Sequence, residues 1–172
     1  MEIKKAMDYF FARLRTKALE ETMKLPVCEF NEKGKHIYFD EKINEDFIEW
    51  EPKPAEEIDM PEIDDEIEEL YSTFYHAEFK GRIKQYHYKF APVYDKEDSE
   101  REITKAFSLG KELFPKEDIY VIATASTEMF GGLYLCYNAD DQMLFVYDPA
   151  SDVRDRIRLT LNGFFYKLKP II

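Results

Sequence analysis

The sequence has little cysteine and no long apolar run. Cys28 and Cys136 are the two cysteines in 172 residues, too few for a disulfide framework, so a reducing compartment is expected. No apolar run approaches the roughly 18–20 residues of a membrane-spanning helix, and no apolar signal segment follows the first six residues. We therefore expect a cytoplasmic protein without a membrane span. Peripheral association at the inner face of the cell membrane stays open.

Residue patterns typical of catalysis and metal binding are also scarce. None of the three histidines (His36, His76 and His87) lies in a His-Glu-x-x-His spacing, and neither cysteine has a partner at metal-ligand spacing. The six glycines form no phosphate-binding loop. Cys136 and His87 could form a nucleophilic pair, but a small apolar residue in a hairpin and a sheet histidine explain them better. We expect no catalysis, metal or cofactor. A small acidic enzyme or nucleotide-binding domain is the distant alternative.

Acidic residues outnumber basic ones, and the excess lies in one part of the chain. The 36 acids and 24 bases give a net charge of −12. Fifteen acids against Lys42 and Lys53 give the stretch from Asp40 to Glu69 a net charge of −13, whereas 22 bases and 21 acids elsewhere give +1. Affinity for nucleic acid comes from cations that contact phosphates, so we expect no nucleic-acid partner. The charge favours a basic protein partner. A solvated face that only maintains solubility is the alternative.

Hydrophobic periodicity predicts an α+β fold. Helices are predicted over 3–24, from Asp59 to Gly81, from Ser99 through Leu113, and over 160–169. Strands are predicted at 35–39, 47–50, 83–90, 119–124, 133–137 and 143–147, with an extended connector at 51–61 and a hairpin between the last two strands. We expect a single domain over residues 1–172, with a mainly antiparallel sheet flanked by helices.

The second predicted helix carries acids beside tyrosines. Successive residues of a helix are roughly 100° apart around its axis. On this spacing, one flank of the apolar stripe carries Asp64, Glu68, Tyr71 and Tyr75. The side nearly opposite the stripe carries Asp65 and Glu69. Like charges four residues apart cost about 0.2–0.5 kcal/mol per pair, so we expect the negative field to have a function. Carboxylates beside aromatics are typical of protein–protein contacts, although tyrosines that merely border the core are the alternative. We expect lysine at positions 64 and 68 to weaken partner binding without lowering the melting temperature.

Several short motifs follow one another in a distinctive order. They are Trp50-Glu51-Pro52-Lys53-Pro54, Thr73-Phe74-Tyr75 with Phe79-Lys80-Gly81, Ile122-Ala123-Thr124 ahead of a hairpin, and Leu168-Lys169-Pro170. This order, over nearly the whole chain, resembles the SecY-interacting protein Syd family of the SUKH superfamily. Gly131-Gly132 and the bulky strand at 143–147 look closer to the broader superfamily.

The resemblance implies a compact α+β fold with a strongly acidic concave surface and no catalysis. Syd proteins bind basic cytosolic loops of the SecY translocon, and related SUKH proteins are immunity proteins that neutralise toxin domains, many of them basic nucleases. We expect an immunity-type role, in which an acidic face neutralises a basic toxin or effector domain. Regulation of SecY is the alternative. The residues expected to contact the partner are Glu49, Trp50, Glu51, Glu56, Glu57, Asp59, Asp64, Asp65, Glu68, Glu69, Tyr71 and Tyr75.

Overall fold

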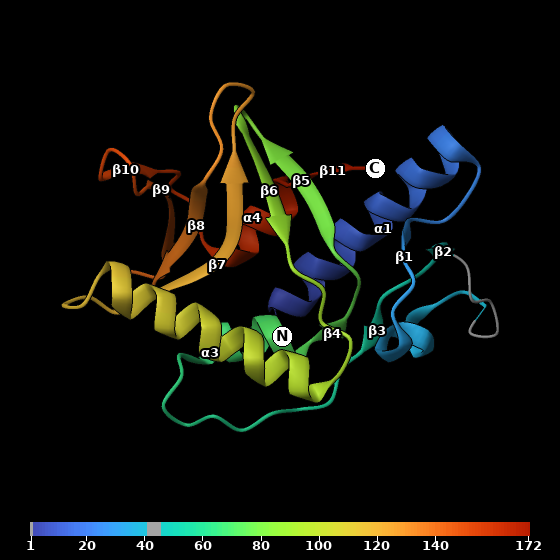
Figure 1. Cartoon of the computed structure of the whole chain (residues 1–172), viewed down its shortest axis with the longest axis horizontal. Helices are drawn as coiled ribbons and strands as arrows, with labels where there is room; N and C mark the ends of the chain where they lie inside the picture. The colour runs from blue at the N-terminus through green and yellow to red at the C-terminus, as the bar shows by residue number, and fades with distance from the viewer. Residues whose placement is uncertain (1, 41–45) are drawn as a thin grey trace.

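A seven-stranded antiparallel sheet forms the centre of the protein (Figure 1). The computed structural model describes residues 2–40 and 46–172. The strand order is β10-β9-β8-β7-β6-β5-β11, and every neighbouring pair is antiparallel. The strands are β5 (Phe79–Ile83), β6 (Tyr86–Phe90), β7 (Ile119–Ser126), β8 (Leu133–Asn138), β9 (Met143–Asp148), β10 (Val153–Arg156) and β11 (Lys169–Ile171).

Two small sheets accompany the central one. Strand β1 (Val27–Glu29) pairs with β2 (Phe47–Glu49), and β3 (Lys53–Pro54) pairs with β4 (Phe74–Tyr75). We call the β1–β2 sheet the arm; it lies beside α1, away from the β8–β9–β10 side of the central sheet (Figure 1). A 3-10 helix, η1 (Glu32–Ile37), follows β1.

Helices cover both faces of the sheet. The first, α1 (Glu2–Thr22), packs with α4 (Leu161–Lys167) behind the sheet, whereas α3 (Lys96–Leu113) crosses the lower part of its front (Figure 1). The helix α2 (Asp65–Ser72) lies next to α3. Alternate residues of the strands point to opposite faces of the sheet. Tyr120 and Tyr137 belong to the main core, while Val121 and Cys136 belong to a smaller apolar cluster with Phe114. The predicted α+β architecture with a mainly antiparallel sheet is confirmed.

Aromatic rings fill the main core. Side chains of α1 at helical spacing, among them Met7, Phe10 and Leu14, are buried there, as the sequence predicts. The rings of Phe79 and Phe90, on neighbouring strands, stack with centroids 4.8 Å apart. This packing accounts for much of the 16% aromatic content of the chain. Within residues 2–40 and 46–172, no helix combines the length and the apolar character needed to cross a bilayer.

The predicted bounds of the acidic helix are wrong at both ends. The helix begins at Asp65, because the carboxylate of Asp64 accepts hydrogen bonds from the backbone N–H groups of Glu66 and Ile67; Asp59 lies outside it. It ends at Ser72 rather than near Gly81, since the next residues pair with β3 and then enter the central sheet.

Four other local predictions are corrected, two by capping residues and two by strand pairing. The predicted strand at 35–39 is mostly the helix η1, which Asn31 caps. The predicted strand at 83–90 comprises the last residue of β5, a turn at Lys84, where φ is 53°, and the strand β6. The third helix starts at Lys96, because Asp95 rather than Ser99 caps it. The last helix ends at Lys167, and the chain then adds β11 to the edge of the sheet.

Candidate functional site

The acidic stretch divides between two parts of the fold. Glu49 lies in the arm, whereas the loop of residues 55–64 and α2 lie at the lower end of the molecule, next to α3 (Figure 1). We call this loop together with α2 the acidic end. Glu41, Lys42 and Glu45 lie outside the described residues. The structure therefore does not bring Glu49 together with the acids of α2.

Several of the predicted contact acids perform structural tasks. Oε1 of Glu49 accepts a hydrogen bond of 2.8 Å from the backbone N–H of Leu25. Glu51 pairs with Lys53 at 2.9 Å. Oε2 of Glu68 accepts a bond of 3.1 Å from the backbone N–H of Met60, which secures the loop before α2.

The cap at Asp64 changes what a substitution there would do. Lysine at position 64 would leave the first N–H groups of α2 without their acceptor, and lysine at 68 would remove the acceptor of the loop bond. Contrary to the expectation from the sequence, we therefore expect this pair of substitutions to lower the melting temperature.

Tyrosines attach the acidic end to the sheet. The phenol of Tyr137 donates to Oε2 of Glu66 at 2.5 Å, and the backbone N–H of Asp64 donates to Oη of Tyr120 at 3.1 Å. The phenol of Tyr71 donates to the carbonyl oxygen of Ile122 at 3.4 Å. Burial, and then the bond to Glu66, raises the pKa of Tyr137 strongly, so this phenol stays a donor. These bonds hold α2 in a fixed position against β7 and β8.

The three aromatic residues expected to contact a partner lie in the core. Trp50 is 1% exposed, Tyr71 8% and Tyr75 7%. All three belong to the main core, because removing large aromatic surface from water is favourable. The aromatic part of the predicted contact surface is thus internal, and only its exposed acids are accessible to a partner.

Five acids of the acidic end are left exposed: Glu56, Glu57, Asp59, Glu62 and Asp65. Among the described residues, none of the acids from Glu56 to Glu69 forms an ion pair with lysine or arginine. Burial raises the pKa of Glu69, with Glu66 and Glu2 adding to the shift. Glu66 and Glu2 therefore lie close enough to Glu69 for their negative charges to oppose its ionisation.

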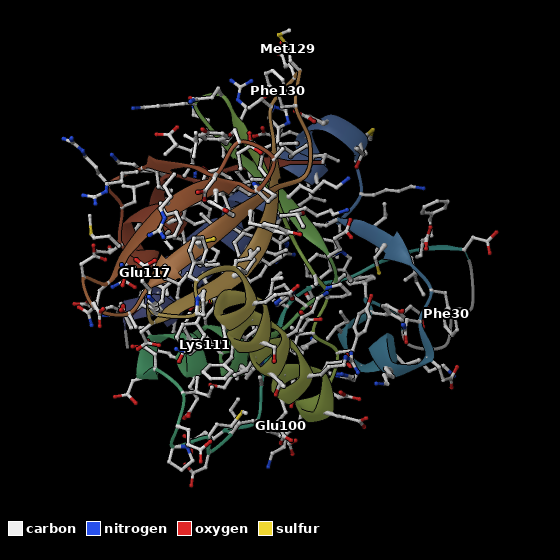
Figure 2. The ribbon with its side chains drawn as sticks, turned by 60° about the vertical axis from the view of Figure 1, so that its left-hand side comes forward. Phe30, Glu100, Lys111, Glu117, Met129 and Phe130 are labelled. Atoms are coloured by element: carbon white, nitrogen blue, oxygen red, sulfur yellow. The ribbon has the colours of Figure 1, made fainter. Side chains whose placement is uncertain are left out.

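The first turns of α3 extend this negative surface. Glu97 and Glu100 are exposed, and Figure 2 shows Glu100 at the same lower end of the molecule. The neighbouring Asp98 is buried and has a different role. Burial opposes its ionisation, but the Tyr94 N–H, Lys33 and Arg101 hold its pKa below the usual value. Sequence reasoning missed the acids of α3, because they are interspersed with bases along the chain.

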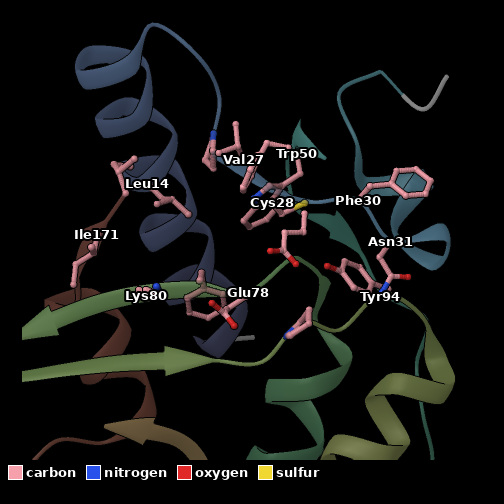
Figure 3. Close-up of a pocket in the computed structure, with 16 residues that line it drawn as sticks. Leu14, Val27, Cys28, Phe30, Asn31, Trp50, Glu78, Lys80, Tyr94 and Ile171 are labelled. Carbon is pink, nitrogen blue, oxygen red and sulfur yellow. The ribbon is translucent and has the colours of Figure 1, made fainter. Parts of the chain in front are cut away.

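A cleft of about 610 Å³ lies between the arm, α1 and β5 (Figure 3). Its wall includes Cys28, Glu78 and Lys80 among mainly apolar side chains, with Trp50 at one side. Burial raises the pKa of the Cys28 thiol to about 11, which keeps it protonated and weakly nucleophilic at neutral pH. The indole Nε1 of Trp50 has no hydrogen-bond partner among the described residues.

The cysteine–histidine pair considered from the sequence has no activated thiol. Cys136 is buried, and burial raises its pKa to about 12. Within residues 2–40 and 46–172, no group of three or more His, Cys, Asp or Glu side chains is placed to hold a metal ion.

Comparison with known proteins adds no evidence about this site. No family model matches the chain, and a search of curated proteins found no match. The similarity to Syd and SUKH proteins therefore stays a prediction from the motifs.

Proposed function

We propose that the protein is a non-catalytic, cytoplasmic binding domain of the Syd-like SUKH type, which neutralises a basic toxin or effector domain through its acidic end. The observation that carries this proposal is the set of five exposed acids from Glu56 to Asp65. They lie together with Glu97 and Glu100 and have no ion-pair partner among the described residues.

The charge arrangement suits a partner that is recognised by its potential. Unpaired carboxylates on one surface steer a cationic protein during association, and their effect falls within about 8 Å at physiological ionic strength. Attachment of α2 to the sheet through Tyr137 supports the proposal, because a rigid charged surface loses little conformational entropy on binding.

The same surface would also suit the alternative function. A Syd-like regulator would bind the basic cytosolic loops of SecY, which present similar chemistry. We favour the immunity-type role because the Gly131-Gly132 segment and the bulky strand β9 resemble the broader superfamily more closely.

Neutral substitutions in the loop provide the test. Glu57, Asp59 and Glu62 are exposed and accept no hydrogen bond among the described residues, so Glu57→Gln/Asp59→Asn/Glu62→Gln removes charge without removing a structural contact. The control, Asp8→Asn/Glu20→Gln/Asp140→Asn, neutralises three exposed acids outside the acidic end. Immobilised variants are incubated with cytosolic and detergent-solubilised membrane extracts at low and high salt, and retained proteins are identified by mass spectrometry.

We expect a basic protein that the wild type and the control variant retain at low salt and that the loop variant loses. Co-expression of that protein with each variant then separates the two roles: rescue of growth from its toxicity supports immunity, whereas salt-sensitive retention of SecY supports the alternative. Equal retention by all three proteins would place the binding site outside the acidic end.

A further inference from the structure

The upper part of the front face of the sheet is cationic. On β5, Lys80 and Arg82 alternate with core-facing Phe79, Gly81 and Ile83, so both cations point away from the core. Three further exposed cations lie on the neighbouring segments: Lys84, Lys89 and Lys169. We call these five residues the cationic face.

Sheet pairing places these charges side by side. Lys80 is the direct cross-strand partner of Lys89, and Arg82 is the partner of Lys169. Like charges opposite one another destabilise a sheet. Strands β5, β6 and β11 contain no aspartate or glutamate, and the described residues give the cationic face no ion pair. The arrangement therefore costs stability and leaves every charge available to an anion.

An exposed apolar tip stands at one end of this face. The loop between β7 and β8 carries Met129, 84% exposed, and Phe130, 65% exposed, followed by Gly131 and Gly132. Ser126, the last residue of β7, pairs with His87, which pairs in turn with Arg82, so the loop begins one strand from the strand of Lys89 and two strands from that of Arg82. Figure 1 shows the β5–β6 turn directly below this loop, and Figure 2 shows Met129 and Phe130 protruding from the molecule.

The acidic end faces the other way. Figure 2 places Glu100 at the lower end of the molecule and Met129 at the upper end. Salt screens exposed charges beyond a Debye length of about 8 Å, so the acids of α2 and α3 have little influence on an anion bound near the upper end. Glu128 is the acid within the loop itself.

We propose that Met129, Phe130 and the cationic face form a docking surface for an anionic lipid bilayer. Exposed methionine and phenylalanine side chains insert into the boundary between headgroups and acyl chains, and the lysines and arginine contact the headgroup phosphates. Here the apolar side chains stand together at one end of the cations, as insertion into a bilayer requires, whereas a surface for single-stranded nucleic acid places aromatics along a cationic groove. The basic partner of the acidic end would then be bound at a membrane surface.

Vesicle flotation tests this docking. The wild type is mixed with vesicles of phosphatidylcholine alone, or of phosphatidylcholine with about one-third phosphatidylglycerol. We expect the wild type to float only with the anionic vesicles. Each cation near the surface contributes about fivefold in partitioning, so Arg82→Gln/Lys84→Gln/Lys89→Gln is expected to reduce partitioning by about a hundredfold. The matched control Lys5→Gln/Lys96→Gln/Lys105→Gln removes three exposed, unpaired lysines elsewhere and has little effect.

A fluorescent reporter follows the loop itself. Phe130→Trp adds an exposed indole to a protein whose one native tryptophan, Trp50, is buried elsewhere and should keep a constant emission. We expect the new emission to shift to the blue with anionic vesicles, and Met129→Ser/Phe130→Ser to float less than the wild type. Three outcomes would overturn the proposal. The wild type does not float, it floats equally with both vesicle types, or the Arg82/Lys84/Lys89 variant and its control lose flotation equally. Binding of a single-stranded oligonucleotide in place of vesicles would assign the face to nucleic acid and overturn it as well.

Discussion

The phenol of Tyr137, near the end of β8, donates a hydrogen bond of 2.5 Å to the carboxylate of Glu66 on α2. This bond joins two residues far apart in the chain and makes the position of the acidic helix a property of the sheet. Burial and the nearby carboxylate together raise the pKa of the phenol, so it stays protonated and keeps its donor hydrogen as the pH rises above neutral.

Removing this bond tests how firmly α2 is held. Tyr137→Phe leaves Glu66 without its donor, and hydrogen bonds to charged groups contribute about 1.5–3 kcal/mol, so we expect the free energy of unfolding in urea to fall by about that amount. Tyr134→Phe, on the same strand but without a hydrogen bond of its phenol among the described residues, is the control and should change stability little. Equal losses in the two variants would show that the bond to Glu66 contributes nothing specific.

The start of the acidic helix gives a second prediction. Asp64→Ala removes the acceptor for the N–H groups of Glu66 and Ile67 and should lower the free energy of unfolding by about 1 kcal/mol. Asp59→Ala changes the residue that the sequence favours as the cap, but it lies in the loop and should cost little. Chemical denaturation of both variants measures the difference. A larger loss at position 59 would contradict the helix start described above.

Close approach of α3 to β7 gives a third prediction. A Cβ atom on Gly110 would lie 1.8 Å from the carbonyl oxygen of Ile119, so Gly110→Ala forces the helix away from the strand. We expect a loss of about 2–4 kcal/mol in the free energy of unfolding.

Gly163 in α4 is the matched control. The nearest atom to a Cβ there is Oγ1 of Thr160, at 3.4 Å, so Gly163→Ala should be neutral or stabilise the protein by about 0.5–1 kcal/mol. If both alanine variants proved equally stable, the tight contact between α3 and β7 would be refuted.

Burial of His76 predicts a pH dependence of stability. Burial lowers the pKa of its imidazole to about 4, and the backbone oxygen of Ala77, 2.9 Å from Nδ1, offsets part of the shift. Between pH 4 and the ordinary histidine pKa near 6.5, the imidazole of residue 76 is protonated in the unfolded chain but neutral in the folded protein. The free energy of unfolding therefore falls as the pH is lowered through this window, by roughly 3 kcal/mol in total.

The variant His76→Gln isolates this contribution, because glutamine cannot be protonated and the carboxyl groups titrate alike in both proteins. We expect the difference in unfolding free energy between wild type and variant to shrink as the pH falls from about 6.5 to 4. The measurement is a series of urea titrations across this range. A difference that stays constant would show that His76 takes up its proton equally well in both states.

Local patterns predicted the elements whose stability is local. The spacing of Ile3, Met7 and Phe10 predicts α1, and the turn between the runs at 133–137 and 143–147 predicts the hairpin that β8 and β9 form. Helix bounds were less predictable, because several residues near Asp64 could act as caps, and the choice depends on how the loop packs.

The surface could be predicted only in part. The chain itself shows the excess of acids between Asp40 and Glu69, and this excess needs no fold to be counted. Which of these acids remain free depends on distant atoms: Leu25 and Met60 use Glu49 and Glu68 as acceptors, and Tyr137 binds Glu66. The burial of Trp50 and Tyr71 is likewise decided by α1 and the sheet.

By itself, the order of residues determined the α+β class, the positions of most helices and strands, and the size of the charge imbalance, because periodicity and composition are properties of short segments. Only the tertiary structure decided that β5, β6 and β11 gather unpaired cations on one face and that the exposed acids of the acidic end lie at the opposite end of the molecule. Charges such as those of Lys80 and Lys169 are far apart along the chain, and only strand pairing brings them onto the same face.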